Sequence, residues 1–256
     1  MKSFNDVKND KWVKKLLIKH ALIMYRQLSN NNCRNIKSIW GKKKMKLYQF
    51  DAAPSSKRVE KFLKETNIQV EIIQLNIMEG EHLREPFKTM NPFNCIPFLE
   101  LDDGTVISES LAICKYLEKT SNSEIKLFGE NTKEKALIEM WNRRLENDGY
   151  LPLFHGARNK FEMFKGAVIP GTRTNFQQNL AVTNWAIESA KTLLTRLDTH
   201  LQSLDFLVSN KLSVADITGF HTLRYAERVG IDIKSYESAF VWFCKLEQRP
   251  AFQESA

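Results

Sequence analysis

The spacing of apolar residues from Met45 onward predicts short strands that alternate with helices. A β-like run begins the pattern, and a turn rich in residues that favour a helix start follows it. Asp-Asp-Gly at 102–104 is a tight-turn signal, so the two runs beside it should pair as a hairpin, and Ser108 should cap the helix after it. The whole pattern predicts strands at 46–50, 70–75, 98–101 and 105–107 and helices at about 56–66, 81–90 and 109–119.

Beyond residue 130 the pattern becomes almost purely helical. The segment 121–130 is polar and rich in turn residues, so we place a domain boundary there. The predicted fold class is α/β plus all-α, with a βαβαββα domain at 45–121 followed by a helical domain at 131–256. Helical spacing extends over about 132–150, 174–204, 213–229 and 237–247, with a surface loop at 160–174.

The charged residues are distributed unevenly along the chain. The 256 residues carry a net charge of +8, but residues 1–44 hold 12 Lys and Arg against 2 Asp, which is +10. The remaining residues hold 26 basic and 28 acidic side chains, which is −2. The body is therefore close to neutral, which argues against nucleic acid as its partner.

The basic segment 1–44 leaves three interpretations open. In the first, the segment is a disordered extension or lies upstream of a true start at Met45. In the second, it is an amphipathic helix that contacts a membrane surface or a partner. In the third, it is a targeting segment. No stretch of the sequence has the apolar length of a membrane span. The four cysteines are widely spaced, which predicts a reducing, cytoplasmic location, and no metal-binding spacing is present.

Four segments of the body resemble the cytosolic glutathione transferases, in particular their phi- and theta-like branches in bacteria and fungi. They are Gly-Glu-His at 80–82, Asn-Pro-Phe-Asn-Cys-Ile-Pro at 91–97, Asp-Gly-Thr-Val-Ile-Ser-Glu-Ser-Leu-Ala-Ile at 103–113 and Ser-Val-Ala-Asp-Ile at 213–217. The resemblance implies a thioredoxin-like domain at 46–120, a helical domain at 131–250 and a homodimer. The last of the four segments also reads as a helix capping box, a structural element.

The same resemblance implies where glutathione, the co-substrate, would bind. Pro97 falls where the family has a cis proline, which exposes the backbone groups of Ile96 to an extended peptide. Glu109 and Ser110 open a helix, where free N–H groups favour a carboxylate. His82 matches the residue that contacts the glycine end of glutathione. The family often has polar donors where Leu83 and Cys95 stand, so at these positions either glutathione binds more weakly or Arg84 or Asn94 substitutes.

The group that would stabilise the glutathione thiolate is less clear from the sequence. The commonest Ser or Cys position of the family is occupied by Ala53, which has no donor and excludes a cysteine-based mechanism. Ser55 is the first candidate, Ser56 the second and Tyr48 a weaker third; the two serines are equally well explained as helix caps.

A substrate pocket is predicted in the helical domain. Phe154, with Phe161, Met163 and Phe164, would form its apolar wall, and His155 or Arg158 would polarise an electrophile; these aromatics also suit a core or an interface. Arg143, Arg144 and Glu146 are expected to be interface or solvated charges.

The resemblance implies a glutathione transferase that attacks hydrophobic electrophiles in detoxification. A non-catalytic binding or scaffold protein of the same fold and a glutathione-dependent peroxidase are the alternatives.

Overall fold

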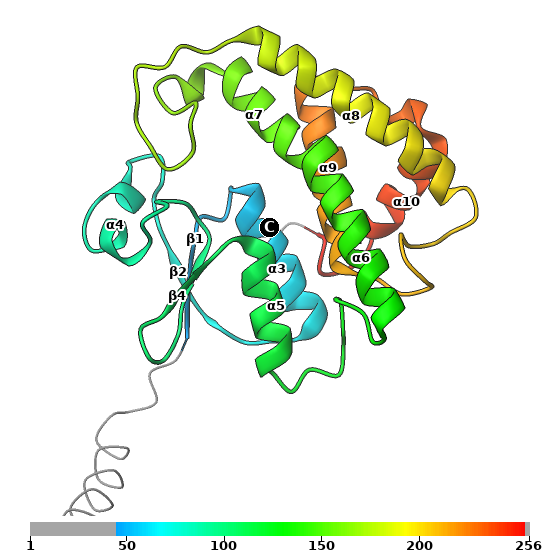
Figure 1. The fold of residues 1–256 in the computed structure, drawn as a ribbon, viewed down its shortest axis with the longest axis horizontal. Helices are drawn as coiled ribbons and strands as arrows, with labels where there is room; N and C mark the ends of the chain where they lie inside the picture. The colour runs from blue at the N-terminus through cyan, green and yellow to red at the C-terminus, as the bar shows by residue number, and fades with distance from the viewer. Residues whose placement is uncertain (1–44, 254–256) are drawn as a thin grey trace, which may run out of the picture. The chain divides into compact units, whose positions relative to one another are not determined.

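The computed structural model describes residues 45–253. The predictions made for residues 1–44 lie outside the described residues. In the first part of the body, the elements follow the predicted βαβαββα order (Figure 1). They are β1 (Lys46–Gln49), α3 (Pro54–Thr66), β2 (Glu71–Gln74), a 3₁₀ turn (Glu81–Leu83), α4 (Phe87–Met90), β3 (Phe98–Glu100), β4 (Val106–Ser108) and α5 (Ser110–Thr120).

The four strands form one mixed sheet in the order β2-β1-β3-β4. β1 is parallel to β2 and antiparallel to β3, and β3 and β4 form the predicted hairpin. Alternate residues of β1 point to opposite faces of the sheet. Leu47 packs into the core with α3 and α5, whereas Tyr48 packs with Phe98 beside Phe87 of α4. Both faces of the sheet are therefore covered, as the thioredoxin-like prediction requires.

Two local predictions in this part are wrong. The helix expected at 81–90 is split in two because Pro86 has no backbone N–H to donate and its ring clashes with the preceding turn. Ser108 does not cap α5: its hydroxyl donates to Asn91 Oδ1 at 2.8 Å, and Glu109 occupies the N-cap position with a φ of 72°.

The second part of the body is helical, as predicted. Its elements are α6 (Thr132–Leu145), a π turn (Glu146–Tyr150), α7 (Leu151–Lys160), a 3₁₀ turn (Glu162–Phe164), α8 (Leu180–Leu201), α9 (Val214–Val229), a 3₁₀ turn (Ile233–Ser235) and α10 (Glu237–Glu247). Helix α7 was not predicted, and α8 begins at Leu180 rather than at 174, where Asn179 caps it through its side chain. A Cβ at Gly149 would lie 2.6 Å from both Leu193 and Thr222, so glycine lets the π turn pack closely on α8 and α9.

The predicted capping box at the start of α9 is confirmed. The buried Asp216 carboxylate accepts the Ser213 N–H at 2.8 Å and the Ser213 hydroxyl at 2.7 Å. It also accepts the Leu207 N–H at 2.9 Å and the Trp242 indole N–H at 3.3 Å. This carboxylate thus joins α9 to α10 and to the segment before them.

One continuous buried cluster runs from Leu47 in β1 to Phe252 beyond α10. The two parts therefore share a core, and the domain division at 121–131 stays a prediction. Within residues 45–253, no helix combines the length and the apolar composition needed to cross a membrane.

Candidate functional site

A cavity of about 470 Å³ brings together residues from both parts of the body. Ten of the residues predicted for the site line it: Ser55, His82, Cys95, Ile96, Pro97, Glu109, Ser110, Phe154, His155 and Arg158. Among the described residues, six buried side-chain polar atoms have no hydrogen-bond partner, and four of these belong to residues that line this cavity. Since buried polar atoms are normally paired, these four atoms leave the cavity with polar groups that are able to bind a polar ligand. We call it the main cleft.

The loop at 91–97 presents free backbone groups to the main cleft. The Ile96–Pro97 peptide bond is cis, as the resemblance implied. Asn91 is fully buried, and its side chain donates to the Cys95 carbonyl at 2.7 Å while accepting from the Ser108 hydroxyl. Within residues 45–253, no hydrogen bond takes up the Ile96 N–H or C=O. An extended peptide can therefore pair with Ile96 as an added strand. Sequence reasoning gave no role to Asn91, although the Asn-Pro motif marks it.

The start of α5 lies beside this loop. Glu109 is held at a φ of 72°, which is unusual for a residue with a side chain and is found at sites where the surrounding structure enforces it. Ser110 is 5% exposed and is the first residue of the helix. The unpaired N–H groups of the first turn, together with the helix dipole, favour an anionic group here.

The three candidates for the thiolate donor lie in different surroundings in the structure. Ser55 lies in the first turn of α3 and lines the main cleft, with its Oγ 3.0 Å from the Tyr150 hydroxyl. Ser56 is fully buried, and its Oγ accepts the Phe50 N–H at 3.3 Å, so it does not reach the cleft. Tyr48 is 7% exposed and donates to Glu100, and burial raises its pKa to about 12. The structure therefore supports neither Ser56 nor Tyr48 in this role.

A buried ion pair between Arg58 and Glu146 lies beside Tyr150. Arg58 of α3 is 3% exposed; it donates to Glu146 at 2.9 Å and to Thr218 at 2.8 Å. Its guanidinium lies 4.7 Å from the centre of the Tyr150 ring. Burial raises the pKa of Tyr150, so the phenol keeps its proton. The expectation that Glu146 is a solvated or interface charge is wrong, because the π turn directs it toward α3.

The other end of the main cleft is rich in cations and in groups without partners. His82 is only 7% exposed, and its Nδ1 has no partner among the described residues. Burial, and then Arg173 and Arg158, lower the pKa of His82, which is therefore neutral near pH 7. The guanidinium of Arg158 lies 4.7 Å from the Phe154 ring centre and 5.0 Å from that of Phe164. Its terminal nitrogen donates to the Ala167 carbonyl.

The loop before α8 covers this end. A Cβ at Gly171, whose φ is +70°, would lie 2.2 Å from the Phe93 carbonyl and 3.2 Å from Cys95 Sγ. Burial and the nearby Glu109 raise the pKa of the Cys95 thiol, while Arg158 lowers it. The sequence marked Gly171 only as part of a surface loop, and the contact with Cys95 could not be read from it.

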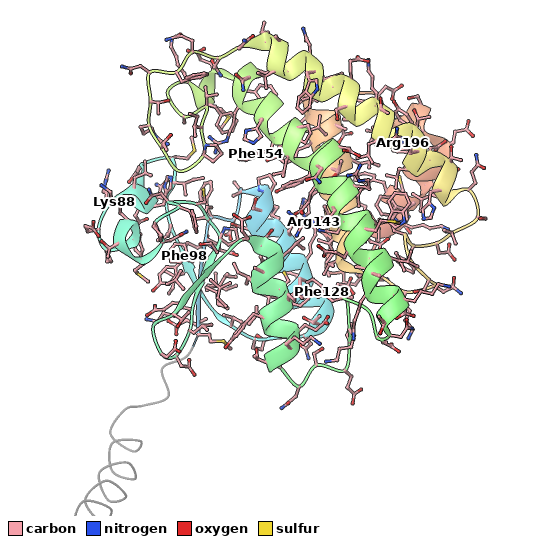
Figure 2. The ribbon with its side chains drawn as sticks, in the orientation of Figure 1. Lys88, Phe98, Phe128, Arg143, Phe154 and Arg196 are labelled. Carbon is pink, nitrogen blue, oxygen red and sulfur yellow. The ribbon has the colours of Figure 1, made fainter. Side chains whose placement is uncertain are left out.

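The remaining predicted pocket residues are divided between several places. Phe154 of α7, which Figure 2 labels, lines the main cleft with His155. Phe161 packs against the core, and Met163 is exposed. Asn94 lines the cleft, whereas Arg84 does not and donates to the Glu79 carbonyl. In the described part of the chain, no three His, Cys, Asp or Glu side chains are grouped as a metal site would require.

Comparisons with known proteins agree with this geometry. Residues 47–124 match the family model of the glutathione S-transferase N-terminal domain, and residues 169–250 match that of the C-terminal domain. Glutathione S-transferase D6 of Drosophila melanogaster is 31% identical over 78% of this chain and 85% of its own length. Glutathione S-transferase 2 of Saccharomyces cerevisiae is 29% identical over 83% of this chain and 90% of its own length.

Solved structures of glutathione S-transferases resemble this fold. A class Gtt2 glutathione S-transferase of Vibrio parahaemolyticus superposes with a TM-score of 0.70 at 35% identity, covering 82% of this chain and 96% of that one. Gtt2 from Saccharomyces cerevisiae gives 0.72 at 28% identity, over 81% and 98%. Fold and cleft together define a thioredoxin-like protein with a helical C-terminal part. The chain belongs to the glutathione S-transferase family, whose members are transferases.

Proposed function

We propose that the main cleft binds glutathione and that the protein joins glutathione, through its sulfur, to hydrophobic electrophiles. The observation that carries this proposal is the gathering of Ile96, Glu109, Ser110 and His82 around one cavity that also contains unpartnered buried polar atoms. The cysteinyl backbone of glutathione would pair with Ile96, and its γ-glutamyl end would meet the start of α5. Its glycine end would then lie toward His82.

The thiolate would be stabilised by Ser55. Either hydroxyl can donate in the contact between Ser55 and Tyr150. In the proposed arrangement Tyr150, which stays protonated, donates to Ser55 Oγ, and this leaves the serine proton for the ligand. A hydrogen bond to a charged group is worth about 1.5–3 kcal/mol, which lowers a thiol pKa by roughly one to two units. The thiol proton passes to water, the sulfur forms a bond to an electrophilic carbon, and the leaving group departs with the bonding electrons. Leu151, Phe154 and His155 line the same cavity and offer an apolar wall for the electrophile.

Arg158 would supply the positive charge that Cys95 does not. Its electrostatic influence on both Cys95 and His82 supports a position near the glycine carboxylate. By analogy with the family, we therefore propose that Arg158 binds glutathione and does not polarise the electrophile. Arg84 is a poor substitute because it does not line the main cleft.

The proposal extends to the setting of the reaction. We propose that the protein acts in the cytoplasm as a homodimer and removes reactive electrophiles. The support is the family to which the chain belongs and the widely spaced cysteines of a reducing compartment.

The test is steady-state conjugation of glutathione to chlorodinitrobenzene. Arg158→Gln should raise KM for glutathione about tenfold and change kcat less than twofold, since one charged contact is worth about 1.4 kcal/mol or more. Arg144→Gln is the matched control because that arginine lies on the exposed side of α6, and it should leave both constants unchanged. Glutathione binding without conjugation would select the scaffold alternative, and turnover of hydroperoxides alone would select the peroxidase.

A further inference from the structure

Part of the segment between α7 and α8 lies across one end of the main cleft. Figure 1 shows this segment reaching from the helical part toward the part that contains α4. Residues 166–174 form a closed loop, because the Thr174 N–H donates to the Gly166 carbonyl at 2.9 Å. Within this loop, Gly171 lines the main cleft and lies against the Phe93 carbonyl. We call residues 166–174 the strap; the proposed reaction gives its side chains no role.

Arg173 is the cationic side chain of the strap, and it lies at the rim of the main cleft. Its terminal nitrogens donate to the Thr172 carbonyl at 3.2 Å and to the Ile77 carbonyl at 3.5 Å. Ile77 lines the cleft. A distance of 3.5 Å exceeds the range of about 2.7–3.2 Å that is usual for N–H···O bonds, so the contact with Ile77 is weak. Arg173 can therefore exchange this carbonyl for a stronger acceptor inside the cleft.

The positive charge of Arg173 acts on two residues that line this end of the cleft. Burial is the largest cause that lowers the pKa of His82, and the charge of Arg173 is the second. Burial also lowers the pKa of Arg158, and Arg173 lowers it further. In the described part of the chain, both arginines donate only to backbone carbonyls. Because like charges repel, an anion between the two guanidinium groups would stabilise this end of the cleft.

Unpaired buried atoms are a second, independent sign of a ligand here. His82 is 7% exposed, and its Nδ1 has no hydrogen-bond partner among residues 45–253. The Nε of Arg158 is also buried and lacks a partner among the same residues. Both side chains line the main cleft. A carboxylate can accept hydrogen bonds from an imidazole N–H and from a guanidinium, so it suits this end better than a neutral group does.

We propose that Arg173 binds the glycine carboxylate of glutathione together with Arg158, and that the strap closes over this end of the bound ligand. The inference rests on the proposed function, which places the glycine end toward His82. Arg173 gives up the Ile77 carbonyl and makes a charge-assisted hydrogen bond to a carboxylate oxygen. The strap then selects thiols that have a free terminal carboxylate over thiols in which this group is esterified or amidated.

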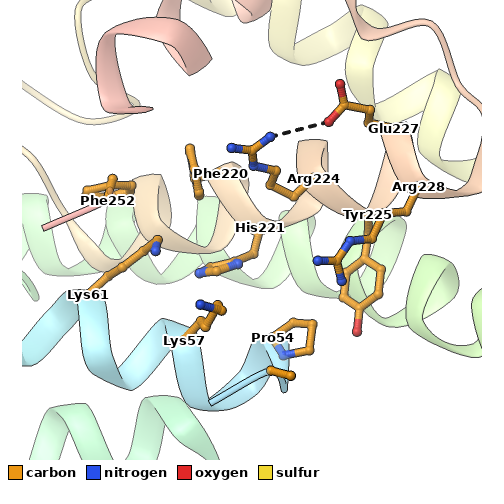
Figure 3. A pocket seen from close by; sticks show the side chains of 11 residues that line it. Pro54, Lys57, Lys61, Phe220, His221, Arg224, Tyr225, Glu227, Arg228 and Phe252 are labelled. Atoms are coloured by element: carbon orange, nitrogen blue, oxygen red, sulfur yellow. Dashed lines mark hydrogen bonds and ion pairs between the residues drawn. The ribbon is translucent and has the colours of Figure 1, made fainter. Parts of the chain in front are cut away.

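Arg228 supplies a matched control, because it is an exposed arginine of the same helical part that lines a different cavity. Figure 3 shows it on α9 near Tyr225, in a cavity of about 180 Å³ between α9 and α3. Among the described residues that line this second cavity, none belongs to the strap. Arg228→Gln therefore removes the same charge as Arg173→Gln without changing the glycine end of the main cleft.

The experiment is calorimetric titration of the full chain with glutathione and with its ethyl ester, in which the glycine carboxylate is esterified. Arg173→Gln should weaken glutathione binding about fivefold, because one charged contact at the rim of the cleft is lost. Its affinity for the ester should equal that of the wild type, since the ester has no carboxylate for Arg173 to bind. Arg173→Lys keeps the charge and should recover most of the loss. Arg228→Gln should leave both affinities unchanged.

The ester separates a contact with the carboxylate from an effect on the shape of the strap. If Arg173→Gln weakens both ligands equally, or weakens neither, the proposal is overturned. It is also overturned if Arg228→Gln loses as much affinity for glutathione as Arg173→Gln does. These results would leave glutathione binding in the main cleft intact. A wild type that binds neither ligand would overturn the proposed function, and the role of Arg173 with it. Because Arg173 is exposed, its variants should fold as the wild type does.

Discussion

Replacement of Glu146 by glutamine should destabilise the protein by about 3 kcal/mol, because it leaves the buried Arg58 without a counter-ion. Breaking a buried ion pair by removing one partner costs about 3–5 kcal/mol. The lower end applies here because the Glu146 side chain is 14% exposed and Thr218 still accepts from Arg58. Urea unfolding followed by tryptophan fluorescence measures the change as a shift of the midpoint at constant slope.

Two variants control this measurement. Glu139→Gln removes a carboxylate that pairs with Arg143 on the exposed face of α6, and it should cost less than about 0.5 kcal/mol. Arg58→Met combined with Glu146→Leu replaces the pair by apolar groups and should recover most of the loss. If Glu146→Gln is no more destabilising than Glu139→Gln, the ion pair of Arg58 and Glu146 does not hold α3 against the helical part.

Three further predictions concern the cover of the main cleft, the α9 cap and pH. Gly171→Ala should raise KM for glutathione at least threefold in conjugation kinetics, whereas Gly166→Ala, with a similar φ of +73° but a nearest neighbour at 3.6 Å, should not. Asp216→Ala should lower the free energy of unfolding by at least about 3 kcal/mol in urea titrations, because several buried donors lose their acceptor. The depressed pKa of His221 means that the unfolded chain binds more protons below about pH 6.5. Wild-type stability should therefore fall as the pH drops through that range, and the fall should be smaller in His221→Gln; equal pH slopes would refute this assignment.

Local motifs allowed much of the fold to be predicted. The turn at 102–104, the loop at 91–97 and the capping box at 213–216 each depend on residues a few positions apart, so their geometry is encoded locally. Where a local signal was misinterpreted, another local residue explains it. Pro86 interrupts the helix expected at 81–90, and Glu109 takes the cap position assigned to Ser108.

The chemistry of the main cleft was less accessible because it depends on distant partners. Ser55 meets Tyr150 across 95 positions, and Arg58 meets Glu146 across 88. Nothing near Ser55 or Ser56 in the sequence shows which hydroxyl faces the cleft, since both lie in the first turn of one helix. The orientation of Glu146 depends on the π turn, whose sequence resembles ordinary helix.

Ultraviolet absorbance of bound glutathione, measured against pH, tests directly whether Ser55 holds the bound glutathione as a thiolate. The thiol of bound glutathione should titrate clearly below the free thiol pKa of about 8.5. Ser55→Ala should raise that bound pKa by at least one unit, whereas Ser56→Ala should leave it unchanged. Glutathione that binds but titrates as it does in water would show that the protein does not stabilise the thiolate.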